Sequence, residues 1–140
     1  MGSVTGLRRL VRRQVKARLP DLQPHLRGAQ VELLRAVETE PGIGVAAAAR
    51  KLHLAGNSVS TLVNQLVDLG MLERTVDPAD RRAARLRLTP AAHVRLGTWR
   101  RARNEFVADR LAALSEVDRN AIAAAVPALN RLIAAIEEDT

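Results

Sequence analysis

Short polar side chains gather on one side of a helix that the sequence predicts from about residue 57 to Gly70. Its apolar residues, Val59, Leu62, Val63 and Leu66, share the opposite side, which we expect to be buried. The polar side and its flanks carry Asn57, Ser60, Thr61, Asn64, Gln65 and Asp68. Amides can form paired hydrogen bonds with adenine, and a threonine methyl group can touch thymine. The pattern favours a helix that contacts DNA bases. A solvated polar face without a partner is the alternative.

A cluster of arginines follows in residues 80–87, where Arg81, Arg82 and Arg85 accompany Asp80. A loop has no folding requirement for so many cations. Arginine side chains at such a place can lie over DNA phosphates or enter a narrow minor groove. We expect Asp80 to orient Arg82 or Arg85 through a charge-assisted hydrogen bond. The alternative is a solvated loop with incidental salt bridges.

The elements that position these residues can be predicted in turn. An alanine-rich helix over Val45–Leu52 and a tight turn at residues 53–56 precede the polar helix, whose N-cap we expect at Asn57 or Ser58. Residues 71–76 and 85–89 then form two strands around a polar turn. Residues of about 45 to 89 are therefore predicted to form a winged helix-turn-helix.

Helices are expected on both sides of this segment. Apolar residues at helical spacing predict one helix over residues 4–19 and a second after Pro24. Thr89 and Pro90 predict the start of a long helix, and Ser115 caps the last one, which Pro127 should kink or split. The fold class is mainly α with a small β-hairpin. The apolar stripes of the end helices either pack between two subunits or complete the core of a monomer.

Composition narrows the function. The 140 residues suit a single domain, and the net charge of +7 points to a polyanionic partner. The chain has no cysteine, which excludes disulfides and thiolate metal sites, and its three histidines lack metal-ligand spacing. No signal peptide or membrane-spanning run is evident, so a cytoplasmic protein is expected. There is no phosphate-binding glycine loop and no catalytic set. Neither an enzyme nor a cofactor or metal site is expected.

The chain resembles the MarR family of bacterial transcriptional regulators. The resemblance covers nearly the whole chain and is sharpest from Gln30 to Thr89. The family's recognition helix is similar to residues 58–66, which lead into residues 69–74. Its wing motif, Asp-x-Arg-x-x-Arg, is met by Asp80, Arg82 and Arg85. The chain departs from the family at residues 90–93, where a glycine is usual, and at Pro127.

The resemblance implies a homodimer that binds a palindromic operator, and a repressor is expected. DNA contacts are expected from the recognition helix and wing: Asn57, Ser58, Ser60, Thr61, Asn64, Gln65, Arg81, Arg82 and Arg85. Residues 26–89 would be the DNA-binding region and residues 1–22 and 90–140 the helical dimerisation region of one domain. Many relatives release DNA when a small molecule binds. The candidate ligand contacts here are His25 and Trp99.

Two other functions stay open at this point. An architectural DNA-binding protein would use its arginines with little regard to sequence, giving a steep salt dependence and a small specificity ratio. A helical protein-interaction module would form a complex that is insensitive to salt and to DNA competition.

Overall fold

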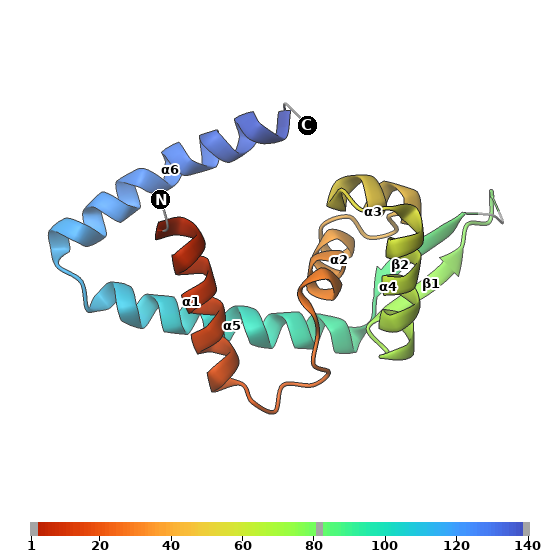
Figure 1. Cartoon of the computed structure of the whole chain (residues 1–140), viewed down its shortest axis with the longest axis horizontal. Coiled ribbons are helices and arrows are strands. Elements are labelled where there is room, and N and C mark those ends of the chain that lie inside the picture. Colours follow the sequence, from red (N-terminus) through yellow and green to blue (C-terminus); the bar gives the residue numbers. More distant parts are fainter. Residues whose placement is uncertain (1–2, 81–82, 139–140) are drawn as a thin grey trace. The chain divides into compact units, whose positions relative to one another are not determined.

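A computed structural model describes residues 3–80 and 83–138 of the chain (Figure 1). Its elements are α1 (Ser3–Arg18), α2 (Gly28–Thr39), α3 (Val45–Leu52), α4 (Gly56–Asp68), β1 (Leu72–Val76), β2 (Ala84–Leu88), α5 (Pro90–Ala112) and α6 (Glu116–Glu138). This order confirms the predicted fold class of helices with one β-hairpin. The contacts divide the chain into two units: Leu19–Arg100, and the two ends of the chain up to Arg18 and from Arg101. Among the described residues, no helix is long and apolar enough to cross a membrane.

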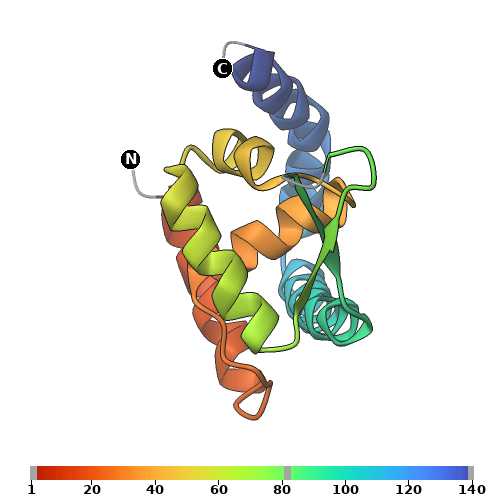
Figure 2. The same cartoon turned by 90° about the vertical axis from the view of Figure 1, so that its right-hand side faces the viewer.

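The unit Leu19–Arg100 is built around an apolar core to which every one of its elements contributes. Figure 2 shows α2 lying between α4 and the hairpin. The buried residues of this core are Leu33, Leu34, Val37, Ile43, Ala48, Ala49, Val59, Val63, Leu66, Met71, Leu72, Leu86, Ala92 and Leu96. The predicted apolar face of α4 is confirmed, because Val59, Val63 and Leu66 are fully buried and Leu62 packs against them. Burial of this face leaves its polar side exposed.

The ends of α4 agree only in part with the sequence prediction. The helix begins at Gly56 with Ala55 at the N-cap position, so neither Asn57 nor Ser58 caps it. The Asn57 carboxamide accepts a hydrogen bond from the backbone of Ser58 instead, at 2.8 Å. The C-terminal end is as predicted. Gly70 adopts φ +70°, its N–H donates to Val67, and the next N–H donates to Leu66, which is the pattern of a glycine-terminated helix.

The β-hairpin aligns β1 and β2 antiparallel, with Arg74 opposite Leu86 and Thr75 opposite Arg85. The predicted alternation of β2 is confirmed, since Leu86 is buried while Arg85 and Arg87 are exposed. A feature that the sequence did not reveal is a third extended segment. Residues 42–44 pair with the free side of β2: Gly42 N donates to Leu86 O at 2.8 Å, and Leu86 N donates to Ile43 O at 3.0 Å. The backbone just before α3 thus forms an edge of the same small sheet.

The ends of the chain form the second unit, in which many apolar side chains are exposed. In α1, Val15 is buried, whereas Val4, Leu7 and Leu10 are exposed. The guanidinium of Arg18 lies 4.5 Å from the ring centre of Phe106. Ser115 caps α6 as predicted, accepting a hydrogen bond from the backbone of Asp118 at 3.1 Å. Pro127 is expected from the sequence to kink or split α6. The helix runs through this proline without a break, so the expected split is wrong, and no described residue of α6 is buried.

Candidate nucleic-acid interface

The exposed polar face of α4 consists of Asn57, Ser58, Thr61 and Asn64. Ser60 lies at its border and is half-buried. The Thr61 hydroxyl donates to the carbonyl oxygen of Asn57 at 3.0 Å, within the helix. Its only proton is therefore used, so Thr61 can meet a partner through its methyl group and as a hydrogen-bond acceptor. The face offers short side chains that allow close approach of the helix to a ligand.

Gln65, which the sequence places on the flank of this face, is turned toward the protein. Its Oε1 accepts a hydrogen bond of 3.1 Å from Nε2 of Gln30, which is only 6% exposed. Gln30 Oε1 in turn accepts a hydrogen bond of 2.8 Å from the backbone N–H of Arg27, just before α2. The chain of amides ties α4 to α2, so the side chain of Gln65 has a bracing role that the sequence pattern did not indicate.

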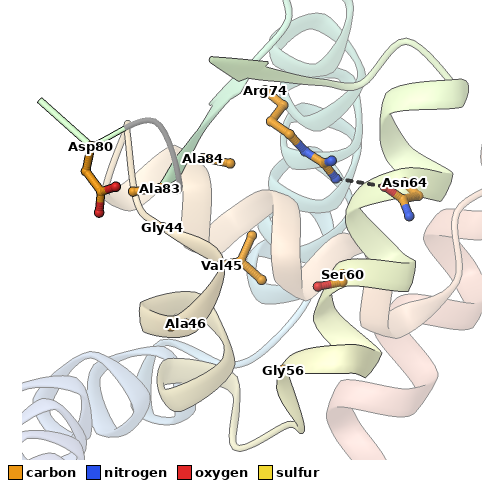
Figure 3. Close-up of a pocket in the computed structure, with 10 residues that line it drawn as sticks. All are labelled: Gly44, Val45, Ala46, Gly56, Ser60, Asn64, Arg74, Asp80, Ala83 and Ala84. Carbon is orange, nitrogen blue, oxygen red and sulfur yellow. Dashed lines mark hydrogen bonds between the residues drawn. The ribbon is translucent and has the colours of Figure 1, made fainter. Parts of the chain in front are cut away.

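Asn64 has a partner that sequence reasoning missed. Arg74, from the middle of β1, donates through Nη2 to Asn64 Oδ1 at 2.7 Å (Figure 3). The alternation of side chains along a strand could have indicated this contact. Side chains two residues apart lie on the same face of a strand, and Leu72, two residues earlier, belongs to the core that α4 also lines.

The wing arginine Arg85 is held by a carboxylate, though not by the expected one. Its Nε and Nη2 donate to Oδ2 of Asp77 at 2.9 and 2.7 Å, and its Nη1 reaches the carbonyl oxygen of Gly42 at 3.4 Å. The assignment of Asp80 as the carboxylate for Arg85 is therefore corrected to Asp77, which strand pairing brings next to β2. The Asp77 pKa lies below its ordinary value, because the carboxylate accepts a hydrogen bond from the Ala79 backbone and another from Arg85.

The structure describes only part of the segment predicted to form the wing. Arg81 and Arg82 lie outside the described residues, and with them the expected pairing of Asp80 with Arg82. The backbone carbonyl of Asp80 accepts a hydrogen bond of 3.0 Å from the Ala83 N–H, and the Asp80 residue is exposed.

A groove lies among α3, α4 and the hairpin, and Figure 3 shows the residues that line it. It has a volume of about 580 Å³ and lies between the start of α3, the polar face of α4 and the hairpin. Its lining consists of Gly44, Val45, Ala46, Gly56, Ser60, Asn64, Arg74, Asp80, Ala83 and Ala84. Most of these side chains are small, so backbone can be approached closely, and Arg74 brings a positive charge. The lining also carries the carboxylate of Asp80, so its formal charges balance.

The two candidate ligand contacts are not brought together at this groove. His25 is exposed and accepts a hydrogen bond of 3.0 Å from the carboxamide nitrogen of Gln23. Trp99 is half-buried on α5. Neither residue lines the groove. Within residues 3–80 and 83–138, no cluster of three His, Asp or Glu side chains is placed to hold a metal ion.

Solved structures match the chain over nearly its whole length. A Mycobacterium tuberculosis protein superimposes with a TM-score of 0.81 at 17% identity, covering 92% of this chain and 88% of its own. Streptococcus pneumoniae FabT, solved in complex with DNA, superimposes with a TM-score of 0.76 at 18% identity, covering 97% of this chain and 93% of its own. A transcriptional regulator of Thermotoga maritima superimposes with a TM-score of 0.70 at 24% identity, covering 97% of this chain and 92% of its own. No protein with a curated description matches the chain significantly.

A family model adds a match in the sequence itself. The model of the MarR family matches residues 25–83, the segment that contains α2, α3, α4, β1 and the wing loop. Fold and sequence thus agree on the segment that holds the polar face and the groove, and the resemblance seen in the sequence is confirmed. Residues 25–83 thus match the MarR family in sequence, and the chain as a whole has the winged helix-turn-helix fold of the matched structures.

Proposed function

We propose that this chain is a sequence-specific transcriptional regulator that binds duplex DNA through α4 and the hairpin. The observation that supports this most directly is the polar face of α4 beside a groove that contains Arg74. An α-helix fits the major groove, where amides and hydroxyls can distinguish the base pairs. Solved structures of the same fold from Streptococcus pneumoniae and Staphylococcus aureus contain DNA, which supports the same use of the fold here.

The wing would contact the DNA backbone. Arg85 is fixed by Asp77 yet remains about half exposed, at 54% of its side chain, so it can still meet a phosphate. Arg81 and Arg82 precede it in the sequence and would add two further cations at the tip of the hairpin. Contacts of this kind position a protein on DNA and make its affinity depend on salt.

Two copies of the chain would bind one operator, with residues 26–89 on the DNA and residues 1–22 and 90–140 forming the dimer. The support comes from α6, where an apolar stripe is between 43% and 59% exposed: Ile122, Val126, Leu129, Leu132, Ile133 and Ile136. Val4, Leu7 and Leu10 of α1 are also exposed. Apolar surface of this extent favours association. A two-fold dimer would place two α4 helices on a palindrome, one helical turn apart.

We further propose that the regulator represses transcription by occupying its operator, and that a small-molecule effector releases it. The support is the match of residues 25–83 to the model of the MarR family. His25 and Trp99 remain the sequence-based candidates for the effector site.

The test is selection of duplexes from a random pool, followed by fluorescence-anisotropy titrations of the full chain across a salt series. We expect a palindromic winner that is bound roughly 10³-fold or more tightly than random DNA. Tight binding at low salt with no preferred sequence would replace this proposal by an architectural role. Absence of binding to any duplex would overturn DNA recognition itself.

A further inference from the structure

The contact between Arg74 and Asn64 restricts which bases Asn64 can recognise. A free asparagine side chain presents one acceptor and one donor group, and can pair with adenine through both. In this protein, however, Arg74 Nη2 lies 2.7 Å from Asn64 Oδ1. A guanidinium has only donors, so the oxygen of the amide must face Arg74 and the NH₂ group must point elsewhere.

The remaining NH₂ group is available to a ligand. Within the described part of the chain, Asn64 Nδ2 has no hydrogen-bond partner, and the residue is exposed on the polar face of α4. Both Asn64 and Arg74 line the groove, as Figure 3 shows. Arg74 is itself anchored by the pairing of β1 with β2, so its position does not depend on the wing loop.

The positive charge of Arg74 strengthens this restriction. An amide oxygen has a second lone pair, which could in principle still accept from the amino group of adenine. The amino hydrogens of adenine and cytosine carry partial positive charge, and a guanidinium at the same edge repels them. The keto oxygens of guanine and thymine are acceptors and meet neither obstacle, whereas the acceptor N7 of adenine lies beside an amino group that the guanidinium repels.

We propose that Asn64, held by Arg74, acts as a donor-only contact that selects a keto base, guanine or thymine, at one position of the operator. Arg74 is thereby a positioning residue that determines specificity from outside α4. The inference rests on the proposed function and deepens it. It differs from the pairing with adenine that the sequence of α4 alone suggests.

The experiment uses the selected operator and the full-length protein. Asn64→Ala identifies the base pair at which preference is lost, and four duplexes that differ only there are then compared. For the wild type we expect a keto base to be preferred over an amino base by about 5- to 150-fold. Asn64→Asp replaces the donor by an acceptor and should reverse the preference, because the amino groups of cytosine and adenine can then donate.

Arg74→Met removes the donors and the charge but keeps an unbranched side chain. We expect the keto preference to fall at least about threefold as adenine becomes acceptable. The matched control is Arg87→Met, the same replacement at an exposed arginine of β2 that has no contact with Asn64. It should weaken binding to all four duplexes alike. Arg74→Lys keeps a cation with donors and should retain the preference.

Each outcome has a separate meaning. All of these positions are exposed, and circular dichroism with a melting curve confirms that each variant is folded. A wild type that prefers adenine or cytosine, an unchanged ratio in Arg74→Met, or no position affected by Asn64→Ala would overturn the inference while DNA recognition stands. Should no duplex be preferred over random DNA, the proposed function fails first and the inference falls with it.

Discussion

The hydroxyl of Thr89 joins the glycine that follows α4 to the start of α5. Its Oγ1 donates to the carbonyl oxygen of Gly70 at 2.7 Å and accepts from the backbone N–H of Ala92 at 3.1 Å. The Thr89 N–H also donates to Met71 O at 3.2 Å. One side chain therefore caps α5 and closes the loop that carries the hairpin.

Removal of this hydroxyl should destabilise the protein. We expect Thr89→Ala to lower the free energy of unfolding by about 1 kcal/mol, a typical value for loss of an N-cap, and Thr89→Ser to restore most of it. Urea unfolding followed by circular dichroism gives the difference. Thr98→Ala is the control, because the Thr98 hydroxyl only donates to Val94 within α5. Equal losses at Thr89 and Thr98 would show that the hydroxyl of Thr89 has no bridging role.

The amide pair between α2 and α4 yields a second prediction. Gln65→Ala leaves Nε2 of the buried Gln30 without its partner, which should cost about 1–3 kcal/mol of unfolding free energy. Asn64→Ala removes an exposed side chain and should cost little stability. In DNA binding the two variants should rank in the opposite order: Asn64→Ala should change the base preference, and Gln65→Ala should largely keep it. Thermal unfolding and anisotropy on the same samples provide both quantities. A change of base preference in Gln65→Ala alone would return Gln65 to the DNA-contacting set.

Asp77 gives a prediction about pH. Its pKa in the folded protein is lowered from 3.8 by the backbone of Ala79 and by Arg85. A lowered folded pKa means that its contribution to stability is fully present above pH 3.8 and is lost as the pH falls through the folded value. In Arg85→Ala we expect the pKa to rise toward 3.8 without reaching it, because the Ala79 hydrogen bond remains. Carbon-detected NMR titration of the Asp77 carboxyl group measures this shift. An unchanged pKa would mean that the ion pair does not persist in solution.

The apolar stripe of α6 predicts the oligomeric state. Ile133→Glu places a charge in the middle of the stripe and should convert a dimer into a monomer in sedimentation-velocity experiments at micromolar concentration. Ala124→Glu adds the same charge on the opposite side of α6, where we expect no effect. If Ile133→Glu remains dimeric, or if the wild type is already a monomer, α6 is not the dimer interface.

The sequence predicted the elements well because their signals are local. The period of the apolar residues in α4, Gly70 at its end, and Thr89 before Pro90 each act within a few residues of the chain. Their agreement with the structure shows that local propensity and tertiary packing point the same way here.

The contacts that organise the candidate site were beyond such reasoning. Arg74 lies ten positions after Asn64 in the chain, and Asp77 lies eight before Arg85. Such contacts depend on the register of the hairpin, and the composition of the turn does not determine that register. Asp77 and Asp80 both lie in the predicted turn, and only the structure shows which of them contacts Arg85. The direction of Gln65 depends on the placement of α2, more than thirty residues away.

The third extended segment of the small sheet has a mechanical consequence. Because residues 42–44 are hydrogen-bonded to β2 and lead directly into α3, a displacement of the hairpin would also pull on the first helix of the helix-turn-helix. The hairpin and α3 are therefore expected to move as one stiff body. If two copies bind one operator, as we propose, a signal would release them by changing the distance between two such bodies, since bending either one internally would require breaking these hydrogen bonds.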